Sequence, residues 1–269
     1  MQEVRIEPTR SRLHAREIIR NAPVIRVLAV RDLKARYKQS VLGPLWIAFQ
    51  PLALLGAYII GFHGVTEIAT GGIPYAVFAL AGVTMWSYFQ AAMVAGTSSI
   101  ISNAALVRKT ACPRFAFPIA SLLAALPSFL VPFIASLIAS LLAGRGSLRL
   151  LLLPVAALWL FVLTAGIVAM SSAISARFRD LISALPFLLQ VGAFVVPVGY
   201  PVSSLSPTLR LLVSLNPLTG AIEAWRWVVL RADHVYLPAI CWSLGFGLVL
   251  VAAGWWVFGR LEVSMADVI

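Results

Sequence analysis

The chain has 269 residues, of which 61% are hydrophobic and only 12% are charged. Soluble domains carry about 25% charged residues. With so few charges the chain cannot cover its own surface with polar groups, so lipid must cover part of it. The composition therefore excludes an ordinary soluble protein and predicts an all-α integral membrane protein. The net charge of +11 is distributed as expected beside a membrane surface, and we expect no nucleic-acid partner.

The first 40 residues are polar and basic. Residues 1–22 lack an apolar core, so they are expected to form a cytoplasmic tail and not a cleavable signal peptide. Residues 23–40 are predicted to form an amphipathic helix in the membrane interface, with cations available to anionic head groups. Arg31 interrupts the apolar face of this helix, which comprises Val24, Val27, Leu28 and Ala35.

Six later runs lack Asp, Glu, Lys and Arg, and each exceeds the roughly 20 residues that a spanning helix requires. They cover residues 41–62, 73–103, 115–144, 150–176, 181–205 and 237–259. We predict six transmembrane helices in a membrane domain of residues 41–269. Pro186, Pro197 and Pro201 lie in the fifth run, so that helix is expected to break near its far end.

A further helix is expected after the fifth run, over residues 217–231. Asn216 is a natural N-cap and Pro217 suits the first helical position. Because this segment is only partly apolar, we predict short re-entrant or interfacial helices on the outer side between the fifth and sixth spans.

Basic residues are distributed unevenly among the segments between the spans. Segments 1–40, 104–114, 177–180 and 260–269 hold 16 of the 21 Lys and Arg residues. The remaining five are Arg145, Arg149, Arg210, Arg226 and Arg231. Because cytoplasmic loops carry the excess of basic residues, both termini are predicted to be cytoplasmic.

The uncharged spans leave no place for a proton or sodium relay, which requires ionisable groups at membrane depth. The sequence contains no Gly-Lys pair for a phosphate-binding loop and neither a GxSxG nor a HExxH motif. Cys112 and Cys241 stand far apart, so no metal site is expected. We therefore expect no catalytic residues and no cofactor in this chain, and any active transport must draw its energy from another subunit.

Residues 31–46, RDLKARYKQSVLGPLW, carry a resemblance to a known family. They are similar to the opening of the ABC-2 type permeases, above all to the branch that exports lipid-linked polysaccharides such as O-antigen, capsule and teichoic acid. Three further segments agree in order and spacing with that branch. These are residues 106–114, residues 177–181, and Asn216 to Leu218 with Glu223 and Arg226.

The resemblance implies a permease subunit in the cytoplasmic (inner) membrane of a bacterium. It implies a homodimer bound to two copies of a separate ATPase, which would bind ATP and magnesium. A lipid-linked polysaccharide would pass through a channel between the two permease copies. Two other functions are kept open: an ABC-2 exporter of a small molecule such as a drug or haem, and an intramembrane enzyme acting on lipids or glycans.

Two groups of residues are expected to act at the cytoplasmic side. The first is a coupling helix that would contact the ATPase, although it could serve only as a positive-inside anchor; it comprises Leu106, Val107, Arg108, Lys109 and Arg114. The second would border the portal where the lipid-linked head group enters, although its glycine and proline could simply form a sharp turn. It comprises Arg31, Lys34, Arg36, Tyr37, Lys38, Leu42, Gly43 and Pro44.

A third group is expected to line the channel, because sugars stack on aromatic faces and bond to amide and hydroxyl groups. The first span supplies Trp46, Phe49, Gln50 and Tyr58, and the fifth supplies Phe187, Gln190, Phe194 and Tyr200. Placement of these aromatics against lipid remains the alternative. Glu223 and Arg226 are spaced i, i+3 and could form a structural pair or contact the substrate.

Overall fold

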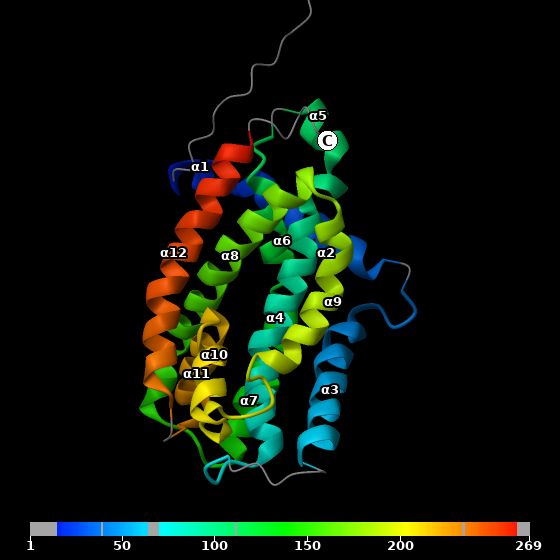
Figure 1. Ribbon diagram of the computed structural model, residues 1–269. Helices are drawn as coiled ribbons and strands as arrows, with labels where there is room; N and C mark the ends of the chain where they lie inside the picture. The colour runs from blue at the N-terminus through cyan, green and yellow to red at the C-terminus, as the bar shows by residue number, and fades with distance from the viewer. Residues whose placement is uncertain (1–14, 39, 64–69, 111, 233–234, 263–269) are drawn as a thin grey trace, which may run out of the picture.

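The computed structural model describes residues 15–38, 40–63, 70–110, 112–232 and 235–262. In this part of the chain all regular elements are helices, as the composition predicts (Figure 1). In chain order they are α1 (Ala15–Arg20), α2 (Ala22–Tyr37), η1 (Gly43–Leu45), α3 (Trp46–Tyr58), η2 (Ile59–His63), α4 (Tyr75–Ser102), α5 (Ala104–Lys109), α6 (Ala116–Ala124), α7 (Pro127–Leu142), η3 (Leu148–Leu152), α8 (Leu153–Arg177), α9 (Asp180–Val195), η4 (Val202–Ser204), α10 (Pro207–Ser214), α11 (Pro217–Leu230) and α12 (Leu237–Leu261).

Five helical stretches among the described residues are long and apolar enough to cross a membrane. They are Gly43–Phe62, Tyr75–Ser102, Ala116–Leu142, Leu148–Arg177 and Leu237–Leu261. Each coincides with one of the uncharged runs. The third is interrupted between α6 and α7, where Pro127 begins the second helix.

The fifth uncharged run forms a shorter helix than predicted. α9 ends at Val195 after 16 residues, a length of about 24 Å against a hydrocarbon core of about 30 Å. The cause is Pro197 and Pro201, which prevent the helix from continuing. Six full-length spans are therefore not confirmed. The chain still passes from one end of the bundle to the other between α8 and α12, by α9 followed by a non-helical segment (Figure 1).

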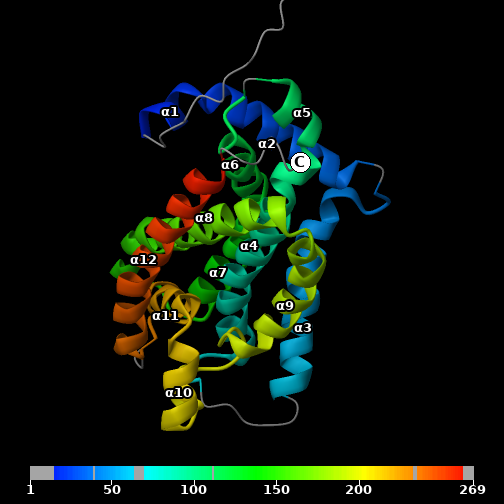
Figure 2. The ribbon, with the colours of Figure 1, turned by 45° about the horizontal axis from the view of Figure 1, so that its top comes forward.

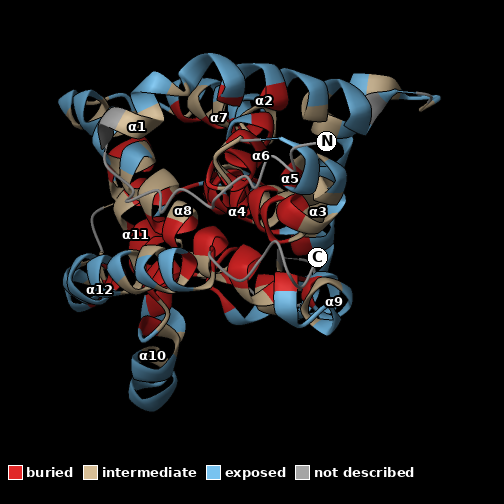
Figure 3. Ribbon diagram, turned by 90° about the horizontal axis from the view of Figure 1, so that it is seen from above, coloured by how far each residue is buried: buried red, intermediate tan, exposed pale blue. Residues whose placement is uncertain are grey.

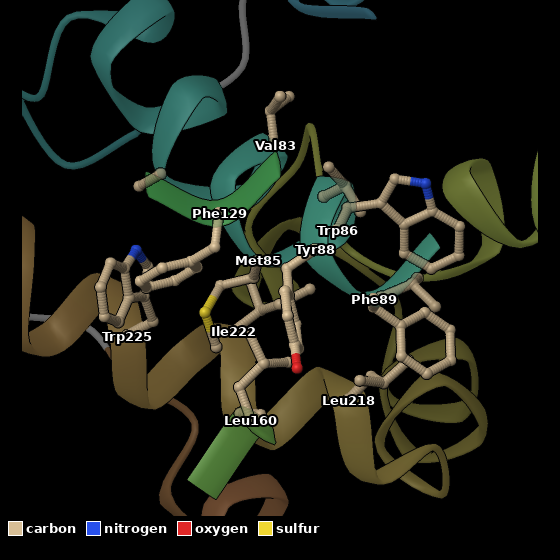
Figure 4. Close-up of a cluster of buried hydrophobic side chains, with 14 of the residues drawn as sticks. Val83, Met85, Trp86, Tyr88, Phe89, Phe129, Leu160, Leu218, Ile222 and Trp225 are labelled. Atoms are coloured by element: carbon tan, nitrogen blue, oxygen red, sulfur yellow. The ribbon is translucent and has the colours of Figure 1, made fainter. Parts of the chain in front are cut away.

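The core is built around α4, which packs against α6, α7, α8 and α11. Tyr88 of α4 lies 4.7 Å from Phe161 of α8 and 6.2 Å from Phe129 of α7 between ring centroids. Phe129 in turn lies 5.5 Å from Trp225 of α11 (Figure 4). Small polar residues add bonds between helices. Thr97 and Ser171 share a 2.8 Å hydrogen bond, and Ser175 donates to the carbonyl of Thr97 at 2.6 Å. Such bonds are a common link between helices in membranes.

α2 lies across the end of the bundle at which α12 also ends (Figures 1 and 2). Ile25, Leu28 and Ala29 are buried in a cluster with residues of α6, α8 and α12. Of the apolar face predicted for α2, Leu28 is buried in this cluster, whereas Val24 and Val27 are exposed. The helix exists as predicted, but it is anchored by packing onto α6 through a different face.

The two helices after α9 differ in their surroundings. α10 projects from the bundle, and its leucines at 209, 211 and 212 are exposed (Figures 2 and 3). α11 begins as predicted, because the Asn216 side chain accepts a bond from the Leu218 amide at 3.0 Å and Pro217 is the first helical residue. However, α11 is buried among α4, α8 and α12 instead of lying on the surface.

Candidate functional site

The exposed side of α3 carries three of the predicted channel residues. Trp46 is 37% exposed and Phe49 is 53% exposed, and their rings pack edge to face with centroids 5.2 Å apart. Gln50 is exposed beside them. These residues share one helical face, as their spacing predicts. α3 therefore presents an aromatic and amide surface to its surroundings and not to its own bundle.

α9 has a similar division between its two sides. Leu185, Leu189 and Ala193 are buried at i, i+4 and i+8 spacing, and α9 packs against α4. The other predicted residues of this helix lie on exposed positions: Phe187, Gln190 and Phe194. Figure 2 shows α3 and α9 side by side. The structure thus brings the two predicted groups onto neighbouring helices.

Aromatic contacts join the far ends of α3 and α9. The ring centroids of Tyr58 and Phe194 are 5.8 Å apart, and those of Phe62 and Tyr200 are 6.1 Å apart. Tyr58 is fully buried and its hydroxyl donates to the Ala193 carbonyl. In a single copy of the chain, Tyr58 is therefore a packing residue between α3 and α9, whereas Phe194 keeps an exposed edge.

The chain after α9 is extended yet buried. Val196, Val198 and Val202 are 3% exposed or less. Because this segment is not helical, its carbonyl groups need partners from elsewhere. Tyr75 donates to the Gly199 carbonyl at 2.9 Å, and Arg226 donates to the carbonyls of Val198 at 2.5 Å and Tyr200 at 3.3 Å.

Arg226 is the central residue of this buried region. It is 1% exposed, and its guanidinium carbon lies 3.8 Å from the ring centroid of Phe78 on α4. Its Nη1 is 3.5 Å from the Glu223 carboxylate, which also accepts a bond from the Tyr236 amide at 3.4 Å. The predicted structural pair is thus present. The burial of this pair was not predicted, because the sequence places Glu223 and Arg226 in a segment on the outer side of the membrane.

The helix predicted to contact an ATPase is α5, at the same end as α2 (Figure 1). Val107 is buried, Leu106 and Arg114 are half-buried, and Arg108 and Lys109 are exposed. Asn103, at the N-terminus of α5, accepts a bond from the Arg31 side chain at 2.5 Å. Val107 therefore seats α5 in the bundle while its cations face outward.

The residues predicted to border a portal lie in the C-terminal half of α2 and in the segment that joins α2 to α3. Gly43 has φ +49°, a left-handed conformation that favours glycine, and its amide donates to the Ser40 carbonyl at 3.2 Å. The predicted sharp turn is therefore confirmed. The other residues of this group are exposed: Arg31, Lys34, Arg36, Lys38, Leu42 and Pro44. The side chain of Tyr37 lies outside the described residues.

These elements define a polytopic helical membrane protein with two exposed aromatic helices and a basic end. Residues 23–230 match the ABC-2 type transporter family, and the chain belongs to that family. This confirms the resemblance found in residues 31–46.

Curated relatives carry a more specific description. The O-antigen export system permease protein RfbA of Klebsiella pneumoniae is 28% identical over 248 residues, covering 90% of this chain and 93% of the relative. A second RfbA from the same species is 25% identical over 253 residues, with the same coverage. The RfbA of Myxococcus xanthus is 27% identical over 214 residues, covering 78% and 82% respectively.

Proposed function

We propose that this chain is the membrane subunit of an ATP-driven exporter of a lipid-linked polysaccharide. It would act as a homodimer with two separate ATPase subunits in the cytoplasmic membrane of a bacterium. The names of the relatives support the class of substrate. The observation that carries the proposal is the exposed row of aromatic and amide side chains on α3 and α9.

Such a surface suits a sliding sugar polymer. Aromatic faces and amide groups make many weak contacts that partly replace the water around a glycan. Charged walls would be costly to place at membrane depth and would hold the polymer at fixed points. Two copies that place their α3–α9 surfaces opposite each other would enclose a path with such walls.

Energy would enter from the end that carries α2 and α5. Arg108 and Lys109 point outward on a short helix whose Val107 is fixed in the bundle. A movement of α5 caused by an ATPase would therefore be transmitted to α2 and α6, since Arg31 of α2 binds Asn103 and α2 packs on α6. The basic C-terminal half of α2 and the exposed turn at Gly43 would receive the anionic head group of the lipid carrier.

The test is deletion of the gene in its native cell, with complementation by the tagged chain. We expect loss of surface polysaccharide, accumulation of the lipid-linked glycan inside the cell, and co-purification of an ATPase with the complementing chain. Normal surface polysaccharide in the deletion strain would reject this substrate and would favour a small-molecule exporter of the same family.

A further inference from the structure

The segment after α9 is not helical, so its backbone carbonyl groups need hydrogen-bond donors from other parts of the bundle. Non-helical backbone inside a membrane protein is tolerated only where protein or water satisfies its polar groups. Here the buried segment 196–200 relies on side chains from two other helices, Tyr75 of α4 and Arg226 of α11.

Arg226 is unusually well suited to this task. Its planar guanidinium presents several donors in a fixed fork, so one side chain can bind two carbonyl groups and a carboxylate together. Glu223 neutralises the buried charge, and the Phe78 ring covers one face of the guanidinium. Gly82 leaves the necessary room, because a Cβ there would collide with the Val198 carbonyl and lie 2.8 Å from Nη2 of Arg226.

The segment that Arg226 binds follows one residue of the proposed path and ends at another. Phe194 precedes it on α9 with 52% of its surface exposed, and Tyr200 ends it. Gly199 packs so closely on the Tyr58 ring that a Cβ would collide with it. A shift of this segment would therefore move both the end of α9 and its contact with α3.

We propose that Arg226 is a positioning residue for transport: by binding the carbonyls of Val198 and Tyr200, it holds the broken end of α9 in the bundle and so fixes Phe194 and Tyr200 at the wall of the path. This proposal rests on the proposed function for its link to transport. The competing explanation is that the Glu223–Arg226 pair is only a neutral unit of packing. Apolar residues can replace such a pair without loss.

The experiment measures the exposure of the segment directly. In the full chain without Cys112 and Cys241, V198C reports on the segment and V168C reports on the core at α8, since both valines are fully buried. Each reporter is combined with E223Q/R226M, which removes both charges and the carbonyl bonds. The matched control is S175A, which removes a buried hydrogen bond to the Thr97 carbonyl, away from this segment. Labelling by N-ethylmaleimide in membranes is followed beside polysaccharide export at matched abundance.

We expect V198C in E223Q/R226M to react about tenfold faster or more, because losing hydrogen bonds from a charged donor increases local opening by at least that factor. V168C should not change, export should fall in the same variant, and V198C in S175A should label like the parent. If E223Q/R226M does not accumulate, R226K replaces it, since a lysine retains the charge but cannot form the fork.

Three results would overturn the proposal. They are slow labelling of V198C in E223Q/R226M, equal acceleration of labelling at V198C and V168C, and full export although V198C labels faster. Failure of the proposed function is a separate result. A deletion strain with normal surface polysaccharide would reject that function and leave the V198C rates unchanged.

Discussion

Gly254 of α12 lies directly against Gly166 of α8, so closely that a Cβ on Gly254 would collide with the Gly166 carbonyl. Close approach of two helices at small residues is a main source of association in membranes. About two turns earlier on α12, Gly247 packs against the Trp159 ring in the same way. The contact between α8 and α12 is the most extensive helix contact in the described bundle. It thus depends on glycines of α12, which have no side chain to separate the two helices.

The first prediction is that Gly254→Ala lowers stability and membrane abundance, because α12 must move away from α8. Overpacking of this kind costs about 1–3 kcal/mol. Gly259→Ala on the same helix is the control, since a Cβ there meets nothing within 4 Å. Thermal unfolding of both purified variants in the same detergent checks this. Equal midpoints for the two variants would contradict the predicted close packing.

A second glycine tests the region around Arg226. Gly82→Ala places a methyl group against the Val198 carbonyl and the Arg226 side chain. Either the buried segment or α11 must shift, so we expect a loss of stability of about 1–3 kcal/mol and reduced export. Gly56→Ala on α3 is the matched control, because a Cβ there has open space. Normal thermal stability of Gly82→Ala would show that the region can adapt.

Local features of the fold were predictable because local chemistry determines them. Asn216 and Pro217 form the predicted start of α11, Gly43 forms the predicted turn, and five uncharged runs form long helices. The family resemblance was carried by residues 31–46 and was confirmed by the match over residues 23–230.

The burial of Arg226 could not be predicted in this way. Its partner Val198 is 28 positions away in the sequence, and nothing local marks a carbonyl that lacks a helical partner. The surroundings of Tyr58 were missed for the same reason, since its bond to Ala193 joins residues 135 positions apart. In both cases the decisive contact exists only after distant helices have packed.

The third prediction concerns orientation. In a chain without Cys112 and Cys241, a cysteine at Ser206 should react with an impermeant reagent in intact cells, and one at Thr110 should react only after the cells are opened. Both positions are exposed. Ser206 directly precedes α10 and Thr110 directly follows α5, and Figure 2 shows these two helices at opposite ends of the bundle. Residue 68, also expected outside, lies beyond the described residues. Cys241 must be removed because it is exposed and would react with the reagent. Cys112 would react more slowly, because burial raises the pKa of its thiol, but it is removed as well so that each variant carries a single cysteine. Reaction of the Thr110 cysteine in intact cells would show that the predicted orientation is wrong.

The fourth prediction concerns α5. Reversal of both charges, R108E/K109E, should weaken co-purification of the ATPase about tenfold or more, as expected for removal of charged interface contacts. The fold should persist, because both side chains are exposed and Val107 seats the helix. R108K/K109R preserves the charge and is the control. Unchanged association together with normal export would leave α5 only the role of a positive-inside anchor.

The last prediction concerns the walls of the path. Replacement of Trp46, Phe49 and Phe194 by alanine, singly and together, should reduce polysaccharide export while ATPase binding and basal ATPase activity persist. The physical reason is the loss of the aromatic faces on which sugar rings would stack. Tyr58 is left intact because it is buried, and truncating a buried aromatic costs about 3–5 kcal/mol.

The control for this triple variant removes exposed apolar side chains from another helix. Leu244, Leu248 and Val249 are exposed on α12, which is not one of the two proposed path helices, so their replacement by alanine should leave export unchanged. Membrane abundance is measured first, and export is compared only between variants at matched abundance. Full export by the α3–α9 triple variant would place the path elsewhere, and loss of export in the α12 variant would mean that α12 also contributes to it. Both triple variants remove apolar side chains from exposed helix faces. If only the α3–α9 variant loses export, the aromatic side chains must therefore act on the polymer.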